Sequence, residues 1–351
     1  MLSLEGVRGM AIAAMFIANI SHLLSVLVLY RLAKTLTPAA KTASIPFVAA
    51  ALHIISPAGL FLSAPYAESL FSLLQFSAIL LYCWSTPGLA HTGSTPETTS
   101  QRAISHDVYL LLSGLLFATA ATVRGNALFA GSIYAYDGMA LLPHLLPLPR
   151  SFKTVRHAIS VILAGLLILA GFAYPQFLAY QEYCTGNVAP VPDWCSEVPA
   201  SIYAYVQNHY WVNGFLRYWT LSNLPLFVLA GPMLAILCSS SISALNDSSP
   251  IQSLLPIPTS NVLKRLAILQ LVLASIVLTT ANVQIITRIA SGYPLLYIWI
   301  AQQIQSEQQE PAAPGKSNIK QNRQYAQVIT RWMVMYALIQ GGLYASFLPP
   351  A

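Results

Sequence analysis

Long apolar runs separated by short polar connections occupy most of the 351-residue chain. Each run approaches the roughly 20 residues that a helix needs to cross a bilayer. The pattern predicts an all-α, polytopic membrane protein with about 8–10 transmembrane helices in a single domain over 1–351. The runs lie at about 10–30, 45–62, 67–84, 155–174, 223–242, 265–287, 289–304 and 326–347.

A further apolar stretch, 107–136, is interrupted by a charge and a helix-weakening glycine at Arg124 and Gly125. It is either one long kinked span or a hairpin of two short helices with a polar tip. Lys and Arg are retained on the cytosolic side of membrane proteins, and a hairpin places most of the 17 basic residues there. A single crossing would move the basic cluster in 137–156 to the other side, so we predict the hairpin.

The composition agrees with a membrane protein. Hydrophobic residues make up 56% of the chain and charged residues 8%, whereas a soluble domain has roughly a quarter of its residues charged. The basic residues behind the net charge of +6 lie in short clusters between apolar runs, so no nucleic-acid partner is expected. No HExxH, GxGxxG or GxxxxGK[ST] motif and no Cys/His cluster occurs, so we expect no metal and no cofactor.

Three polar connections are long enough to describe. The segments 85–106, rich in Thr, Ser, Gly and Pro, and 305–324, rich in Gln, Glu and Lys, are predicted to be cytosolic connectors. The largest predicted lumenal loop, 175–222, contains Cys184 and Cys195 on either side of a Pro-rich turn. An oxidising lumen favours a disulfide between them, and the alternative is that all four cysteines are free.

Within that loop, residues 201–221 carry seven aromatic side chains interleaved with amides, a histidine and an arginine. Aromatic rings with polar tips collect at membrane interfaces, and the added amides favour a binding site for a polar ligand over a plain interfacial belt. The candidate binding residues in this stretch are His209, Tyr210, Trp211, Arg217 and Tyr218.

Other polar residues are predicted at the same, lumenal ends of the spans. Arginine binds phosphate well, and three arginines on one side, Arg124, Arg217 and Arg288, favour an anionic ligand. Two of the candidates also have simpler explanations. The alternative for Arg124 is that it snorkels to lipid headgroups, and the alternative for Glu68 is that it caps a helix. The remaining candidates are Tyr66, Glu68, Asn126 and Gln284, of which Gln284 is spaced i, i+4 from Arg288.

Several blocks of the sequence closely resemble the GPI mannosyltransferase 2 (PIG-V) family. They include SPAGLFLSAPYAESLFSLL at 56–74 and ATVRGN at 121–126, followed by 201–232, 282–301 and 331–351. The resemblance implies a GT-C type helical bundle, multi-pass in the endoplasmic reticulum membrane. It also implies transfer of the second, α-1,6-linked mannose from dolichyl phosphate mannose to the GPI glycolipid precursor on the lumenal side, with a small membrane partner subunit.

The sequence departs from this family in one respect. Members begin with a further helix and a loop that carries a Trp-Asp motif, whose Asp is the presumed catalytic base, whereas Met1 falls after that region. We therefore expect an N-terminally truncated member whose catalytic residue is unknown, with Glu68 as a weak candidate. The alternatives are a non-catalytic membrane assembly subunit and a polytopic transporter.

Overall fold

The computed structural model describes residues 4–37, 44–89, 99–145, 151–185, 190–246, 255–309 and 317–346. These residues form helices, turns and loops, and no strand occurs among them. The all-α architecture predicted from the sequence is confirmed. Five helical segments are long and apolar enough to cross a membrane, so the protein is a multi-pass membrane protein. They are Gly6–Leu36, Ile104–Val123, Phe152–Cys184, Leu221–Leu245 and Ile257–Thr280.

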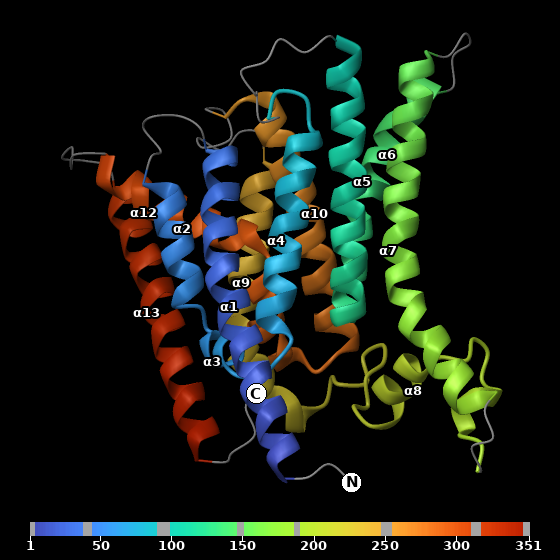
Figure 1. Cartoon of the computed structure of the whole chain (residues 1–351). Helices are drawn as coiled ribbons and strands as arrows, with labels where there is room; N and C mark the ends of the chain where they lie inside the picture. Colours follow the sequence, from blue (N-terminus) through green and yellow to red (C-terminus); the bar gives the residue numbers. More distant parts are fainter. Residues whose placement is uncertain are drawn as a thin grey trace.

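The longer helices lie roughly side by side in one bundle, and the chain passes back and forth between its two ends (Figure 1). We call the lower end in Figure 1, where α4 begins and α10 ends, the site end, and the upper end the distal end. The bundle helices are α1 (Leu4–Leu36), α2 (Ile45–Ile54), α4 (Glu68–Ser85), α5 (Thr99–Val123), α6 (Gly131–Leu145), α7 (Phe152–Cys184), α9 (Leu224–Leu245), α10 (Ile257–Thr280), α12 (Pro294–Gln309) and α13 (Ser317–Ala345).

Short helical elements connect the bundle helices at the site end. They interrupt the regular helical hydrogen bonding where the chain turns, which leaves polar side chains and backbone groups near the ends of the long helices. These elements are α3 (Gly59–Ser63), η2 (Gly125–Ala130), η3 (Asp193–Ser196), α8 (Ile202–His209), η4 (Leu221–Asn223), η6 (Val283–Ile285), α11 (Ile286–Ile289) and η7 (Ala290–Gly292).

The predicted hairpin at 107–136 is present. Helix α5 ends at Val123, Arg124 adopts an extended conformation, and the chain returns through η2 into α6. Both helix ends that flank the 85–106 connector lie at the distal end, and so do those that flank 305–324 (Figure 1). The hairpin tip, the start of α4 and the end of α10 lie at the opposite end, the site end (Figure 1).

Several predicted boundaries differ from the structure. Helix α2 ends at Ile54 instead of 62, because Pro57 disfavours helical backbone in the residue before it. Helix α10 ends at Thr280 instead of 287. Helix α7 continues through Pro175 to Cys184, so it occupies the start of the predicted loop 175–222. Helices also enter the predicted connectors, since α5 begins at Thr99 and α12 reaches Gln309.

Helices α5 and α7 approach each other closely through small residues. A methyl group on Gly171 would lie 2.3 Å from the carbonyl oxygen of Ala118, and one on Gly114 would lie 2.8 Å from the Cα atom of Ala164. Small residues let the backbones of membrane helices pack at short distance, and here they join the hairpin to α7.

We expect Gly171→Ala to destabilise the protein by about 1–3 kcal/mol, because the added methyl group meets backbone that has no room to move. Gly165→Ala is the matched control on the same helix, since its nearest neighbour would be the Cβ atom of Tyr134 at 3.8 Å. Thermal unfolding in detergent should show a lower Tm for Gly171→Ala and little change for Gly165→Ala. Equal Tm values for the two variants would contradict this packing.

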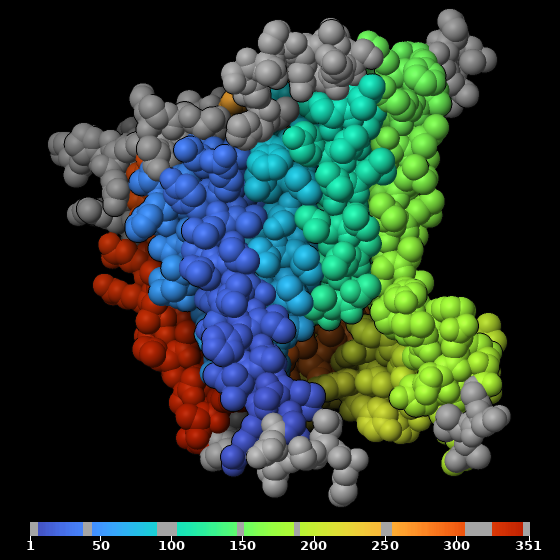
Figure 2. Space-filling model, viewed as in Figure 1, coloured from blue at the N-terminus to red at the C-terminus, as the bar shows by residue number. Residues whose placement is uncertain are grey.

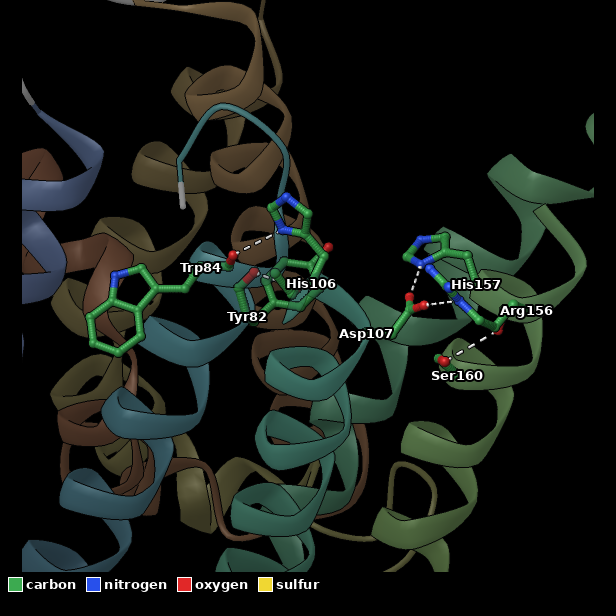
Figure 3. Close-up of polar contacts among 8 residues, drawn as sticks. Tyr82, Trp84, His106, Asp107, Arg156, His157 and Ser160 are labelled. Atoms are coloured by element: carbon green, nitrogen blue, oxygen red, sulfur yellow. Dashed lines mark hydrogen bonds and ion pairs between the residues drawn. The ribbon is translucent and has the colours of Figure 1, made fainter. Parts of the chain in front are cut away.

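Buried charges toward the distal end are paired across helices. The carboxylate of Asp107 on α5 accepts hydrogen bonds from Arg156 at 2.6 Å and His157 at 2.9 Å, both on α7 (Figure 3). Asp137 on α6 accepts a hydrogen bond of 2.7 Å from the Tyr82 hydroxyl and pairs with Arg265 on α10. Buried charges are retained in membrane helices when they are paired, and these pairs connect α4, α5, α6, α7 and α10.

Candidate functional site

A cavity of about 620 Å³ lies at the site end, between the hairpin tip, α8, the end of α10 and α11. Figure 2 shows the surface hollowed beneath the end of α5, beside the segment that follows α7. Leucine, isoleucine, valine and phenylalanine side chains line one part of the cavity, and polar and aromatic side chains line the other. The polar and aromatic lining comprises Arg124, Asn126, Tyr203, Gln207, Trp211, Asn213, Thr280, Asn282 and Arg288, with Phe129 and Phe172 among the apolar rings.

Two arginines from distant parts of the chain meet at this cavity. Arg124 sits at the tip of the α5–α6 hairpin, where the helix has ended and its side chain projects from extended backbone. Arg288 lies in α11, a four-residue helix that exists because α10 stops at Thr280 and the chain turns through η6. Both guanidinium groups line the cavity, so the site end presents concentrated positive charge there.

Glu68 holds the two arginines together. Its carboxylate oxygen Oε1 forms ion pairs with Arg124 and with Arg288, and the Glu68 side chain is 1% exposed. The residue is the first of α4, where the helix dipole favours a negative charge. Two guanidinium groups share one carboxylate, so the cluster keeps a net positive charge. Glu68 does not itself line the cavity, which makes it a positioning residue in this structure.

Two aromatic rings also contact the Arg288 guanidinium. Its central carbon lies 4.5 Å from the ring centre of Phe61 and 4.6 Å from that of Tyr66. These two rings pack edge to face with their centres 5.3 Å apart, and they come from α3 and the turn before α4. Cation–π contacts of this kind stabilise a partly buried arginine, so Tyr66 orients Arg288 from outside the cavity lining.

The candidates in the aromatic stretch 201–221 separate into two groups. Trp211 lines the cavity, whereas His209, Tyr210, Arg217 and Tyr218 lie outside its lining. His209 stacks on Tyr205 with ring centres 5.1 Å apart. The exposed Arg217 side chain donates to the side-chain oxygen of Asn208, so this arginine supports the loop and does not join the other two.

Gln284 and Arg288, which are spaced i, i+4 in the sequence, belong to different short elements, η6 and α11. The Gln284 side chain accepts a hydrogen bond of 2.9 Å from the Tyr218 hydroxyl. This bond ties the aromatic stretch to the segment that carries Arg288.

Five of the polar and aromatic lining residues were not among the predicted candidates: Tyr203, Gln207, Asn213, Thr280 and Asn282. The Tyr203 ring lies over Gly125, where a methyl group would be 3.1 Å from it, so glycine at the hairpin tip allows this contact. Burial raises the pKa of the Tyr203 hydroxyl above its ordinary value, and nearby Arg124 opposes the shift. The sequence shows Tyr203 as part of the aromatic stretch, but it gives no signal for the contact of Tyr203 with Gly125 at the hairpin tip. Asn282 was hidden by the expectation of an unbroken span.

Three asparagines, Asn126, Asn213 and Asn282, belong to the cavity lining. Each amide side chain has N–H donors and a carbonyl acceptor, which are the groups that bind hydroxyl groups of a ligand. The cavity therefore offers both hydrogen-bond donors and acceptors beside its two arginines.

The loop that carries the aromatic stretch is held to the end of α7. Cys184 and Cys195 form a disulfide whose Cα atoms are 5.6 Å apart. The Gln176 side-chain oxygen accepts hydrogen bonds from the Ser201 hydroxyl at 3.1 Å and from the Tyr203 backbone at 3.0 Å. These contacts fix the start of α8, and with it Tyr203 and Gln207, against the cavity.

The fold and the cavity together define a multi-pass helical membrane protein with a cationic, amide-lined cavity at one end of its bundle. Such a lining suits a ligand that carries both an anionic group and hydroxyl groups. The chain belongs to the Mannosyltransferase (PIG-V) family, whose family model matches residues 1–351.

Curated relatives cover nearly all of the chain. It is 40% identical over 337 residues to GPI mannosyltransferase 2 of Aspergillus oryzae, covering 95% of this chain and 73% of the relative. It is 38% identical to GPI mannosyltransferase 2 of Chaetomium globosum, covering 99% of this chain and 73% of the relative. Among solved structures, an oligosaccharyltransferase of Archaeoglobus fulgidus matches with a TM-score of 0.45 and 13% identity, over 92% of this chain and 42% of that chain.

Proposed function

We propose that this protein takes part in transfer of the second, α-1,6-linked mannose from dolichyl phosphate mannose to the GPI glycolipid precursor. We place the reaction on the lumenal side of the endoplasmic reticulum membrane, which is the side of the site end. Family membership supports mannosyl transfer, and the names of the relatives support the GPI precursor as acceptor. The observation that carries the proposal is the convergence of Arg124 and Arg288 on one cavity.

The geometry assigns a separate task to each kind of lining residue. A lipid phosphate leaves with the donor's negative charge when its bond to the sugar breaks, and fixed guanidinium groups stabilise that charge. Arg124 and Arg288 are held for this by Glu68 and by the Phe61 and Tyr66 rings. The amide side chains of Asn126, Asn213 and Asn282 in the cavity lining suit sugar hydroxyl groups.

The described cavity lining supplies no general base. Deprotonation of the acceptor hydroxyl needs a carboxylate within hydrogen-bond reach, and the described lining contains no Asp or Glu. The Glu68 carboxylate is engaged with two arginines. We therefore assign donor-phosphate binding and substrate positioning to these residues. The base is proposed to come from a Trp-Asp loop like that of the family, which residues 1–351 do not contain, and a small membrane subunit is the proposed partner.

The test measures mannosyl transfer in microsomes from cells that lack the endogenous activity and express this sequence within a full-length family protein that supplies the Trp-Asp loop. Labelled dolichyl phosphate mannose and a GPI precursor with one mannose are the substrates, and an α-1,6-specific mannosidase identifies the product linkage. A second mannose that the mannosidase removes supports the proposal. Retention of a membrane partner without transfer would instead indicate an assembly subunit, and solute flux in proteoliposomes without transfer would indicate a transporter.

A further inference from the structure

The segment 210–221, which we call the aromatic strap, exposes a row of large apolar side chains at the site end. Phe215 is 74% exposed and Leu221 is 90% exposed. Rings and aliphatic side chains of this size are normally buried, so several of them exposed within one short segment indicate a surface with an apolar partner. The exposed members of the row are Tyr210, Trp211, Val212, Phe215, Leu216, Trp219 and Leu221.

The strap is bonded to the end of a membrane-spanning helix. The last carbonyl groups of a helix lack partners within the helix, and the strap supplies them for α10. The backbone N–H of Gly214 donates to Thr280 at 2.9 Å, and that of Leu216 donates to Thr279 at 2.7 Å. The indole N–H of Trp219 donates to the Leu278 carbonyl at 2.8 Å. These bonds hold the strap level with the end of the span.

The next span begins where the strap ends. The apolar segment Leu221–Leu245 is long enough to cross a membrane, and it starts at the last residue of the strap. One span therefore stops beside the strap and another starts from it, which places the strap at the depth where a membrane meets water. Trp and Tyr are enriched at that depth because their rings have both an apolar body and a polar edge.

The backbone of the strap is held in an unusual conformation. Val212 and Leu216 have φ angles of 51° and 54°, in the left-handed region that favours glycine. A β-branched residue rarely adopts this conformation, so the surrounding contacts must enforce it. The hydrogen bond from the Asn213 backbone to Gln207 at 2.8 Å and the two bonds to α10 do so. In this conformation Val212 is 58% exposed and Leu216 is 45% exposed.

The inward side of the strap is part of the cavity wall. Trp211, Asn213 and Gly214 line the cavity that Arg124 and Arg288 also line. The same short segment thus has one side on the polar cavity and the other side exposed at the level of the span ends. Trp211 belongs to both sides of the strap, since it lines the cavity and is 56% exposed.

We propose that the aromatic strap lies in the membrane leaflet and forms a lateral doorway between that leaflet and the cavity. Its exposed side contacts lipid chains, and its inner side admits the headgroup of a lipid-borne substrate to the arginines. This inference rests on the proposed function only for the identity of that substrate. The placement of the strap in the leaflet rests on the exposed side chains and on the bonds to α10.

Placement in the leaflet is tested with nitroxide labels at Phe215→Cys and, as a water-exposed control, at Val198→Cys, which is 98% exposed. The full chain carries Cys238→Ser, since Cys83 is buried, and is reconstituted into phosphatidylcholine vesicles. The label at 215 should collide more with oxygen than with a water-soluble nickel chelate, and the label at 198 should show the reverse. A label at 215 that matches 198, or that a protein partner shields from both reagents, overturns the proposal.

The doorway is tested by comparing two donors in the microsomal assay, dolichyl phosphate mannose and a short-chain, water-soluble prenyl phosphate mannose. The double variant Phe215→Ser with Leu221→Ser should raise KM for the long-chain donor about tenfold and leave KM for the soluble donor unchanged. Val198→Ser is the matched control and should change neither. An equal effect on both donors, or no effect on either, overturns the doorway. If the unsubstituted protein transfers no mannose, the proposed function fails while the nitroxide measurement still decides the placement of the strap.

Discussion

Replacing Arg124 with alanine should lower kcat/KM for mannosyl transfer by a factor of about 100 to 1,000, the loss typical of removing one preorganised contact to a developing charge. Arg124 lines the cavity at the hairpin tip and is held there by Glu68. Arg124→Lys keeps the charge but loses the planar, two-pronged geometry of guanidinium, so it should restore only part of the activity. The microsomal assay described above measures all three proteins.

Two controls make the Arg124 result specific. Arg8→Ala removes an exposed positive charge near the start of α1 and should leave transfer unchanged. Arg217→Ala removes a sequence-predicted candidate that lies outside the cavity lining, and its effect should be far smaller than that of Arg124→Ala. Equal losses of kcat/KM for Arg124→Ala and Arg217→Ala would contradict a role of the cavity in the reaction.

Replacing Glu68 with glutamine should both destabilise the protein and reduce transfer. The substitution removes a buried carboxylate that two arginines share, and breaking a buried ion pair from one side costs about 3–5 kcal/mol. The two guanidinium groups would then repel each other at the cavity. Thermal unfolding in detergent should show a Tm well below that of the unsubstituted protein.

Inorganic phosphate distinguishes this positioning role from catalysis. An anion that binds between the two arginines should raise the Tm of Glu68→Gln more than that of the unsubstituted protein, because it replaces the missing negative charge. Glu68→Asp keeps the charge on a shorter side chain. The rise in its Tm on adding phosphate should lie between those of Glu68→Gln and the unsubstituted protein. If Glu68→Gln abolished transfer with an unchanged Tm and no response to phosphate, Glu68 would be acting as the base itself.

The sequence predicted the elements of the site better than their contacts. The hairpin at 107–136 followed from the distribution of basic residues, and Arg124 and Arg288 were placed on a common side. The role of Glu68 was open, because its partner Arg288 is 220 residues away in the chain. Such a contact depends on how α4, the hairpin tip and α11 pack, and local patterns carry no information about it.

The end of α10 shows why some boundaries escaped prediction. Residues after Thr280 are still apolar enough to extend a predicted span, so hydrophobicity alone gives no signal for the break. The break is stabilised by the aromatic strap, whose backbone N–H groups and Trp219 indole take over the last carbonyls of the helix. Those partners come from another part of the chain. The candidates Arg217 and Gln284 likewise bind partners that the sequence did not reveal, Asn208 and Tyr218, and both lie outside the cavity lining.

The three members of the charge cluster enter the membrane at different times during synthesis. Glu68 and Arg124 are made early, in α4 and at the tip of the α5–α6 hairpin, whereas Arg288 follows after α10. A nascent chain that has emerged only through α10 therefore holds the Glu68 carboxylate with one of its two arginines. Residues of η6 and α11 line the cavity, so the cavity wall is complete only after this segment has been made.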